Sequence, residues 1–280
     1  MPPLRLYYNT NGLAHHSLAD AIDLVADLGY DGLALTPDVP HLDPRHASAA
    51  DVAGVAAHLR RRGLQVSIQT GARFVLDPAR KHWPTLLDDD PAARARRLSF
   101  LVRCLDIGRD LGADVLSFWS GAVLPTSSAS EPELLRRLAD GAEALSAAGA
   151  ARGLRVGLEP EPGMLVGTVA QYEALRKFTK DPQFGLAFDL GHAHCSGEGD
   201  PAELIAAHGA DLLDVQVEDM RRGEHVHLAF GEGTLDLRAS VAALHQVSYR
   251  GPVVVELSRD SHRAPTVAAA AITHLRGLGA

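Results

Sequence analysis

Acidic residues close three short apolar segments of this 280-residue chain. Glu159 and Glu161 end LRVGLEPEP, Asp189 ends FGLAFD, and Glu256 ends VVVE. Apolar runs of this length are typical of buried strands in a parallel sheet, whose strands all end on the same side. Ionised carboxylates that lie close together repel one another, so they need a cation, protons or a basic partner. The pattern therefore predicts a metal-dependent site built from Glu159, Asp189 and Glu256.

A glutamine takes the corresponding place in a fourth apolar segment. Gln216 lies in LLDVQV, where that run ends. An amide oxygen can bind a hard cation, although more weakly than a carboxylate or an imidazole. Glu159, Asp189, Gln216 and Glu256 would form an all-oxygen site, which favours Mg²⁺ or Mn²⁺ over zinc. The alternative is that Gln216 only forms hydrogen bonds and leaves three ligands.

Short apolar segments alternate with amphipathic segments along the whole chain, which predicts strands and helices in alternation. The predicted strands are 4–8, 32–36, 64–69, 113–119, 154–159, 184–189, 212–217 and 252–257. The predicted helices lie near 17–28, 47–62, 92–110, 131–151, 168–179, 201–208, 237–247 and 264–277. Eight such units fit an α/β protein with a (β/α)8 barrel spanning 1–280 as one domain. They fit an open doubly wound sheet less well, because no Gly-rich first turn is present.

One connection is longer than the others. Segment 71–91, between the third strand and its helix, is rich in proline and charge. In a barrel of this type the loops after the strands form the catalytic mouth. This segment is therefore predicted to be a lid or a substrate-binding loop, with a plain surface excursion as the alternative.

Bulk properties exclude several classes of protein. The formal net charge is −8, which argues against nucleic acid as a partner. The two cysteines form no disulfide framework. The first residues, MPPLRLYYNTNG, lack the pattern of a secretory signal, and no apolar run is long enough to span a bilayer. We expect a cytoplasmic protein without a membrane partner.

The runs LEPEP, FDLGHAH, VQVEDMRRGEHVHLAFGEGTLD and VVVELS resemble the xylose-isomerase-like barrel superfamily of sugar and sugar-phosphate isomerases and epimerases. The resemblance covers nearly the whole chain. It implies one divalent cation, Mn²⁺ or Mg²⁺ first and Co²⁺ or Zn²⁺ next, bound by Glu159, Asp189, Gln216 and Glu256. The ketose 3-epimerases of the superfamily carry a histidine where this chain has Gln216.

The resemblance also implies a reaction, proton transfer next to a carbonyl through an enediolate, with Glu159 and Glu256 as the acid/base pair. The substrate would be a small polyhydroxylated molecule: a sugar, a sugar phosphate or a cyclitol. Dimers and tetramers are common in the superfamily. The implied substrate contacts are His192 and Arg222, and we add Trp119, which could stack on a sugar ring, Glu161 and His227.

Two other functions remain open. His192, His225 and His227 could hold a further metal ion, as in the apurinic endonucleases of the superfamily, which would indicate a hydrolase or lyase with a multinuclear site. A role in DNA repair is not expected, because this chain has Gln69 and Trp119 at positions where those endonucleases have histidines. Gln216 also makes a non-catalytic accessory barrel conceivable. A metal stoichiometry above one favours the first alternative, and absence of proton exchange at carbon favours the second.

Overall fold

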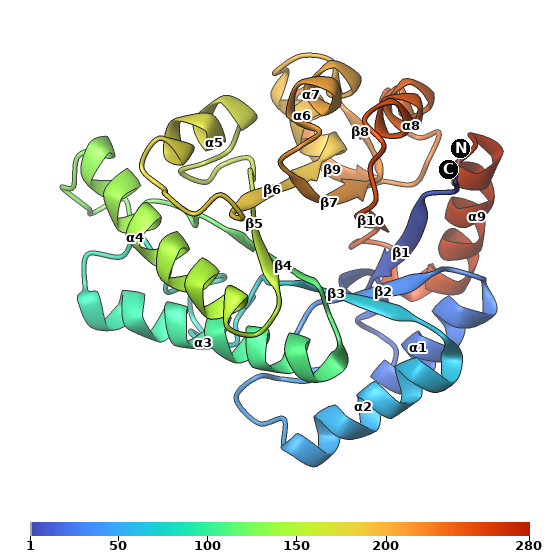
Figure 1. Ribbon diagram of the computed structural model, residues 1–280, viewed down its shortest axis with the longest axis horizontal. Helices are drawn as coiled ribbons and strands as arrows, with labels where there is room; N and C mark the ends of the chain where they lie inside the picture. The colour runs from blue at the N-terminus through green and yellow to red at the C-terminus, as the bar shows by residue number, and fades with distance from the viewer. Residues whose placement is uncertain (1) are drawn as a thin grey trace.

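Parallel strands close into a barrel inside a ring of helices in the computed structural model, which describes residues 2–280 (Figure 1). Within that range, eight strands follow the order β1-β10-β7-β6-β5-β4-β3-β2 around the barrel. They are β1 (Arg5–Asn9), β2 (Gly32–Leu35), β3 (Gln65–Gln69), β4 (Val115–Trp119), β5 (Arg155–Glu159), β6 (Gly185–Asp189), β7 (Leu212–Val217) and β10 (Pro252–Val255). The predicted (β/α)8 barrel is confirmed, and each strand lies within about two residues of its predicted bounds.

The helices cover the outside of the barrel. They are α1 (Leu18–Asp27), α2 (Ala49–Arg62), α3 (Pro91–Leu111), α4 (Glu131–Ala150), α5 (Val169–Arg176), α6 (Leu190–Ser196), α7 (Pro201–His208), α8 (Leu237–Gln246) and α9 (Ala264–Gly277), with 3-10 turns at Thr10–Leu13 and Ser261–Arg263. Across residues 2–280, no helix is both long and apolar enough to cross a membrane.

Local sequence signals set the helix ends. Ser48 and Asp51 form a reciprocal capping box at the start of α2, and Gly63 ends this helix with a φ of 69°. Asp90 caps α3, and Pro91 occupies its first position, where the missing N–H is harmless. These signals fix where α2 begins and ends and where α3 begins.

The interior of the barrel changes from apolar to polar along its axis. Tyr7, Ala34 and Val254 form a separate buried cluster. Alternate residues of a strand point the same way, so the residue two positions after an interior one faces the barrel axis at the mouth. On β5, Glu159 lies two positions after Gly157. On β10, Glu256 lies two positions after Val254, so both glutamates face the barrel axis at the mouth. The strands thus bring their terminal carboxylates to one place.

The connection after β7 differs from the sequence prediction, which made it a loop. It forms an antiparallel hairpin of β8 (Asp219–Arg221) and β9 (Glu224–Leu228). Gly223, with a φ of 77°, supplies the left-handed conformation that the two-residue turn needs. Because β9 is a strand, His225 and His227 project from the same face. The short helix α6 is a second difference, because no helix was predicted there: it begins at Leu190, directly after β6, with Asp189 as its N-cap.

Candidate metal-dependent active site

A cavity of about 350 Å³ opens at the C-terminal ends of the barrel strands. The residues proposed from the sequence that line it are Trp119, Glu159, Glu161, His225, His227 and Glu256. The long segment between β3 and α3 contributes Gly71, Arg73, Lys81 and His82. That segment therefore borders the site, as predicted. The volume suits a small molecule of sugar size.

Glu159 is nearly buried, with 4% of its surface exposed, and is held by the indole of Trp119. The Trp119 Nε1–H donates to Glu159 Oε2 at 2.9 Å. Burial, and then the charges of Glu256, Glu161 and Asp189, raise the pKa of Glu159 well above its usual range. Trp119 is thus a positioning residue for Glu159 as well as a wall of the cavity.

Glu256 follows β10 and is oriented by two asparagines. Asn9 Nδ2 donates to Glu256 Oε2 at 3.2 Å, and Asn11 Nδ2 donates to Oε1 at 2.8 Å. Asn9 is itself held by the Thr36 hydroxyl at 2.8 Å. The carboxylate of Glu256 is therefore restricted in rotation while it still lines the cavity.

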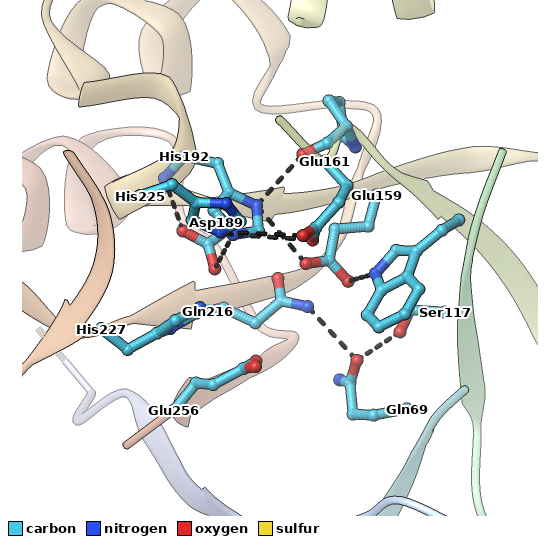
Figure 2. A network of polar contacts seen from close by, with 12 residues as sticks. Gln69, Ser117, Glu159, Glu161, Asp189, His192, Gln216, His225, His227 and Glu256 are labelled. Atoms are coloured by element: carbon cyan, nitrogen blue, oxygen red, sulfur yellow. Dashed lines mark hydrogen bonds and ion pairs between the residues drawn. The ribbon is translucent and has the colours of Figure 1, made fainter. Parts of the chain in front are cut away.

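Asp189 and Gln216 lie between these glutamates, on the neighbouring strands β6 and β7 (Figure 2). The two residues pair in the strand register and are 1% and 0% exposed. Asp189 Oδ1 accepts the backbone N–H of His192 at 2.8 Å, whereas Oδ2 has no hydrogen-bond partner among residues 2–280. Gln216 Oε1 likewise has none within the described chain. A buried oxygen without a hydrogen-bond donor destabilises the folded state. A bound cation removes this penalty, because the oxygen then acts as its ligand. The residues present therefore fit a divalent ion.

A relay of side chains across the barrel explains why Gln216 presents its oxygen. Gln69 Nε2 donates to Asp214 Oδ2, so Gln69 Oε1 faces the other way and accepts from the Ser117 hydroxyl. The same Gln69 oxygen accepts from Gln216 Nε2 at 3.2 Å (Figure 2). The amide nitrogen of Gln216 is thereby used, which leaves its oxygen free for a ligand.

We expect Gln69→Met to weaken Mn²⁺ binding by about 10- to 100-fold, because an outer residue that orients a ligand typically has an effect of this size. Calorimetric titration measures it. Gln65→Met is the matched control, since Gln65 lies on the same strand and bonds to Arg5 and Tyr7, away from the mouth. Equal Mn²⁺ affinity in the two variants would contradict the relay.

Three histidines and Glu161 form one side of the site (Figure 2). His192 Nδ1 is 3.2 Å from the Pro160 carbonyl, and its Nε2 is 3.0 Å from His225 Nε2. Glu161 lies 3.6 Å from His192 Nε2 and 3.7 Å from His225 Nε2. One nitrogen from each of His192, His225 and His227 falls within 4.8 Å of the others, which is compatible with a shared ion.

Burial sets the direction of the pKa shift for His192, His225 and Glu161, whereas at His227 the neighbouring Glu218 outweighs burial and raises the pKa to about 10. Burial lowers the pKa of His192 to about 4, so this imidazole is neutral near pH 7 and its contacts with carboxylates are not ion pairs. Burial, followed by the charges of Glu256 and Asp189, raises the pKa of Glu161 to about 8. In the metal-free protein, therefore, the Glu161 carboxyl holds a proton at neutral pH.

Arg222, a predicted substrate contact, is not brought to the cavity. It occupies the turn between β8 and β9 and is exposed. Together with His194 and Asp236 it lines a separate hollow. Arg222 lies away from the cavity because it is in the two-residue turn of the β8–β9 hairpin, at the end that points away from the barrel strands.

Several residues of the site were not predicted. Asn11 follows β1 in a 3-10 turn, a position that no strand-end argument reaches. Asp214 and Glu218 lie on either side of Gln216 in the alternation DVQVE, and both are 0% exposed. Polar residues at every second position of a buried strand were the available signal for these two.

This chain belongs to the xylose isomerase-like TIM barrel family, whose sequence profile matches residues 22–278. It is 28% identical over 275 residues to a 3-dehydroshikimate dehydratase of Pseudomonas aeruginosa, covering 94% of this chain but only 39% of that protein's length. It is 26% identical over 201 residues to an L-ribulose-5-phosphate 3-epimerase of Shigella flexneri, covering 71% of this chain and 69% of the relative.

A solved structure shares the fold. The D-allulose 3-epimerase of a Methylomonas species superposes with a TM-score of 0.78 at 20% identity, over 99% of both chains. The relatives named here are enzymes that act on small molecules, and two of the three are sugar epimerases.

Proposed function

We propose that this protein is a divalent-metal-dependent isomerase or epimerase of a sugar, sugar phosphate or cyclitol. The observation that carries the proposal is the pair of buried oxygens, Asp189 Oδ2 and Gln216 Oε1, that lack hydrogen-bond partners in residues 2–280. They lie beside two glutamates that line one cavity and are each held by neighbouring side chains.

Glu159, Asp189, Gln216 and Glu256 would hold the ion, and Mn²⁺ or Mg²⁺ suits their oxygen atoms. When bound, the cation supplies Lewis-acid stabilisation of the negative charge that develops on the substrate's carbonyl oxygen. One of the two glutamates removes a proton from the carbon next to the carbonyl, which gives the enediolate. The other glutamate returns a proton to the opposite face in an epimerase, or to the neighbouring carbon in an isomerase.

The rest of the cavity orients the substrate. Trp119 and Asn11 keep the two glutamates in place. Glu161, His225 and His227 face the same space and can bond to hydroxyl groups. Lys81 and Arg259 also line the cavity, and neither makes an ion pair within the described residues. These two cations favour a substrate with an anionic group such as a phosphate.

Heavy water provides the test. The Mn²⁺-loaded protein is incubated in D₂O with a panel of ketoses, ketose phosphates and keto-cyclitols. We expect deuterium at the carbon next to the carbonyl of at least one compound, detected by mass spectrometry. Binding of a compound without any exchange would instead indicate the accessory barrel.

A lyase that removes water is the second candidate. The dehydratase relative matches 94% of this chain, more than the epimerase relative does. The first step is the same: a glutamate takes the proton next to the carbonyl. The hydroxyl at the next carbon then leaves with a proton as water, and a double bond forms. A product lighter by one water distinguishes this reaction from epimerisation.

The raised pKa values predict how metal binding depends on pH. A ligand must be deprotonated to bind a metal, and the pKa of Glu159, a proposed ligand, is raised, so metal binding releases its proton. The charge of the ion also favours loss of the proton from the neighbouring Glu161, whose pKa is about 8. Mn²⁺ affinity should therefore rise between about pH 6 and about pH 8, by up to about tenfold per pH unit for each proton released.

The stability of the metal-free protein should change in the opposite direction. A carboxyl whose folded-state pKa is raised favours folding below its unfolded pKa, and this contribution is lost as the pH rises through the folded value, here about 8 for Glu161. The increase in Tm on adding Mn²⁺ should accordingly be larger at pH 8 than at pH 6. Affinity and Tm increments that do not change with pH would contradict the assignment.

A further inference from the structure

Glu218 is a buried carboxylate that the four-ligand site does not use. It follows β7 directly and is 0% exposed. Neither of its side-chain oxygens has a hydrogen-bond partner anywhere in residues 2–280. A buried carboxylate in this condition is strongly unfavourable unless a proton or a cation compensates it.

The groups that face Glu218 are potential metal ligands. His227 Nδ1 lies 3.8 Å from Glu218 Oε2, too far for a hydrogen bond, and this nitrogen also has no partner within the described residues. One ligand atom from each of Asp189, Glu218 and His227 lies within 4.8 Å of the others. Ligands bound at about 2.1 Å to one ion are about 3 to 4 Å apart, and the 3.8 Å between His227 Nδ1 and Glu218 Oε2 falls in this range.

The backbone leaves room for Glu218 at this place. Gly191, in α6, has no side chain, and a Cβ atom there would collide with Glu218 Oε1. Asp189 caps the same helix with Oδ1, which leaves Oδ2 turned toward the cluster. The three groups come from β6, from the residue after β7 and from β9, so an ion among them would tie the hairpin to the barrel.

We propose that Asp189, Glu218 and His227 bind a second divalent transition-metal ion. A site with one imidazole and two carboxylates favours Zn²⁺ or Mn²⁺ over Mg²⁺. Asp189 and Glu218 do not line the mouth cavity, whereas His227 does, so this ion would lie behind the wall of the cavity. The inference rests on the proposed function only through Asp189, which would serve both ions.

Metal counting on defined variants tests the proposal. Chelator-treated protein is titrated with MnCl₂, and in a separate experiment with ZnCl₂, by calorimetry and elemental analysis. We expect two ions per chain in the unaltered protein. Glu218→Gln should retain one ion and weaken the second at least about tenfold, with a smaller metal-induced rise in Tm. Glu224→Gln, whose carboxylate is 56% exposed on the same hairpin, is the matched control and should keep both ions.

The contradicting results are distinct. One ion per chain in both the unaltered protein and Glu218→Gln overturns the second site. It leaves the proposed function intact, because the single ion is then bound by the four proposed ligands, which do not include Glu218. A second ion that is lost in His225→Gln but kept in Glu218→Gln assigns it to the three histidines and also overturns the proposal. If no ion binds, both the second site and the metal-dependent function fail. Should Glu218→Gln not fold by circular dichroism, His227→Gln replaces it with the same expectation.

Discussion

Replacing Glu256 with glutamine is expected to lower kcat by about 1,000-fold on whichever substrate shows exchange at carbon. A positioned general acid or base contributes about 10² to 10⁴ in rate, and the amide of glutamine can neither remove nor return the proton. Glu159→Gln should have an effect of the same size. Steady-state kinetics and deuterium incorporation measure both variants, with folding checked by circular dichroism.

The surroundings of each glutamate make this test specific. Glutamine keeps an oxygen that can accept from Asn11 at position 256 or from Trp119 at position 159, so the local packing is retained. Glu173→Gln is the control, because that carboxylate is 58% exposed on α5. Full activity in both Glu159→Gln and Glu256→Gln would show that the assignment of the acid/base pair is wrong.

The second large effect is expected from Asp189→Asn, which should weaken Mn²⁺ binding by at least about 100-fold and abolish turnover. Asp189 is a proposed ligand, and an amide oxygen is a weaker ligand for a hard cation than a carboxylate. Asparagine is as good a helix cap as aspartate, so the hydrogen bond to the His192 N–H and the start of α6 should survive. The loss then reports on the metal rather than on folding.

The chain offers a matched variant for Asp189→Asn. Asp200 caps α7 in the same way, accepting the backbone N–H of Ala202, and it is exposed. Asp200→Asn should bind Mn²⁺ as the unaltered protein does. The contradicting result has two parts: the Tm of the metal-free protein falls equally in both variants, and the Mn²⁺ affinity is unchanged in both. Asp189 would then act only as a helix cap.

The barrel and the convergence of its strand ends could be predicted because both depend on local pattern. Apolar runs that end in Glu159 and Asp189 imply buried strands, and parallel strands place their ends together. The hairpin after β7 could not be separated from a loop, since EHVHL carries only weak alternation and lies outside the barrel. The family resemblance implied Arg222 as a substrate contact, whereas it occupies the turn of this hairpin.

The orientation of the Gln216 side-chain amide could not be predicted from the sequence, for a different reason. Its orientation depends on Gln69 and Asp214, which meet across the barrel although they are 145 positions apart. A hydrogen-bonded relay of this kind is a property of the closed barrel, and no short segment encodes it. The sequence alone left two possibilities for Gln216, and its ligand role is our proposal, based on the absence of a hydrogen-bond partner for Oε1 within residues 2–280.

The most direct test of metal dependence is the Mn²⁺ affinity of the chelator-treated protein, measured by calorimetry at pH 8 with elemental analysis of the protein as purified. Our account predicts at least one ion per chain, bound with micromolar affinity or tighter and released by chelator. The absence of a bound metal after purification, together with no binding on titration, would contradict it.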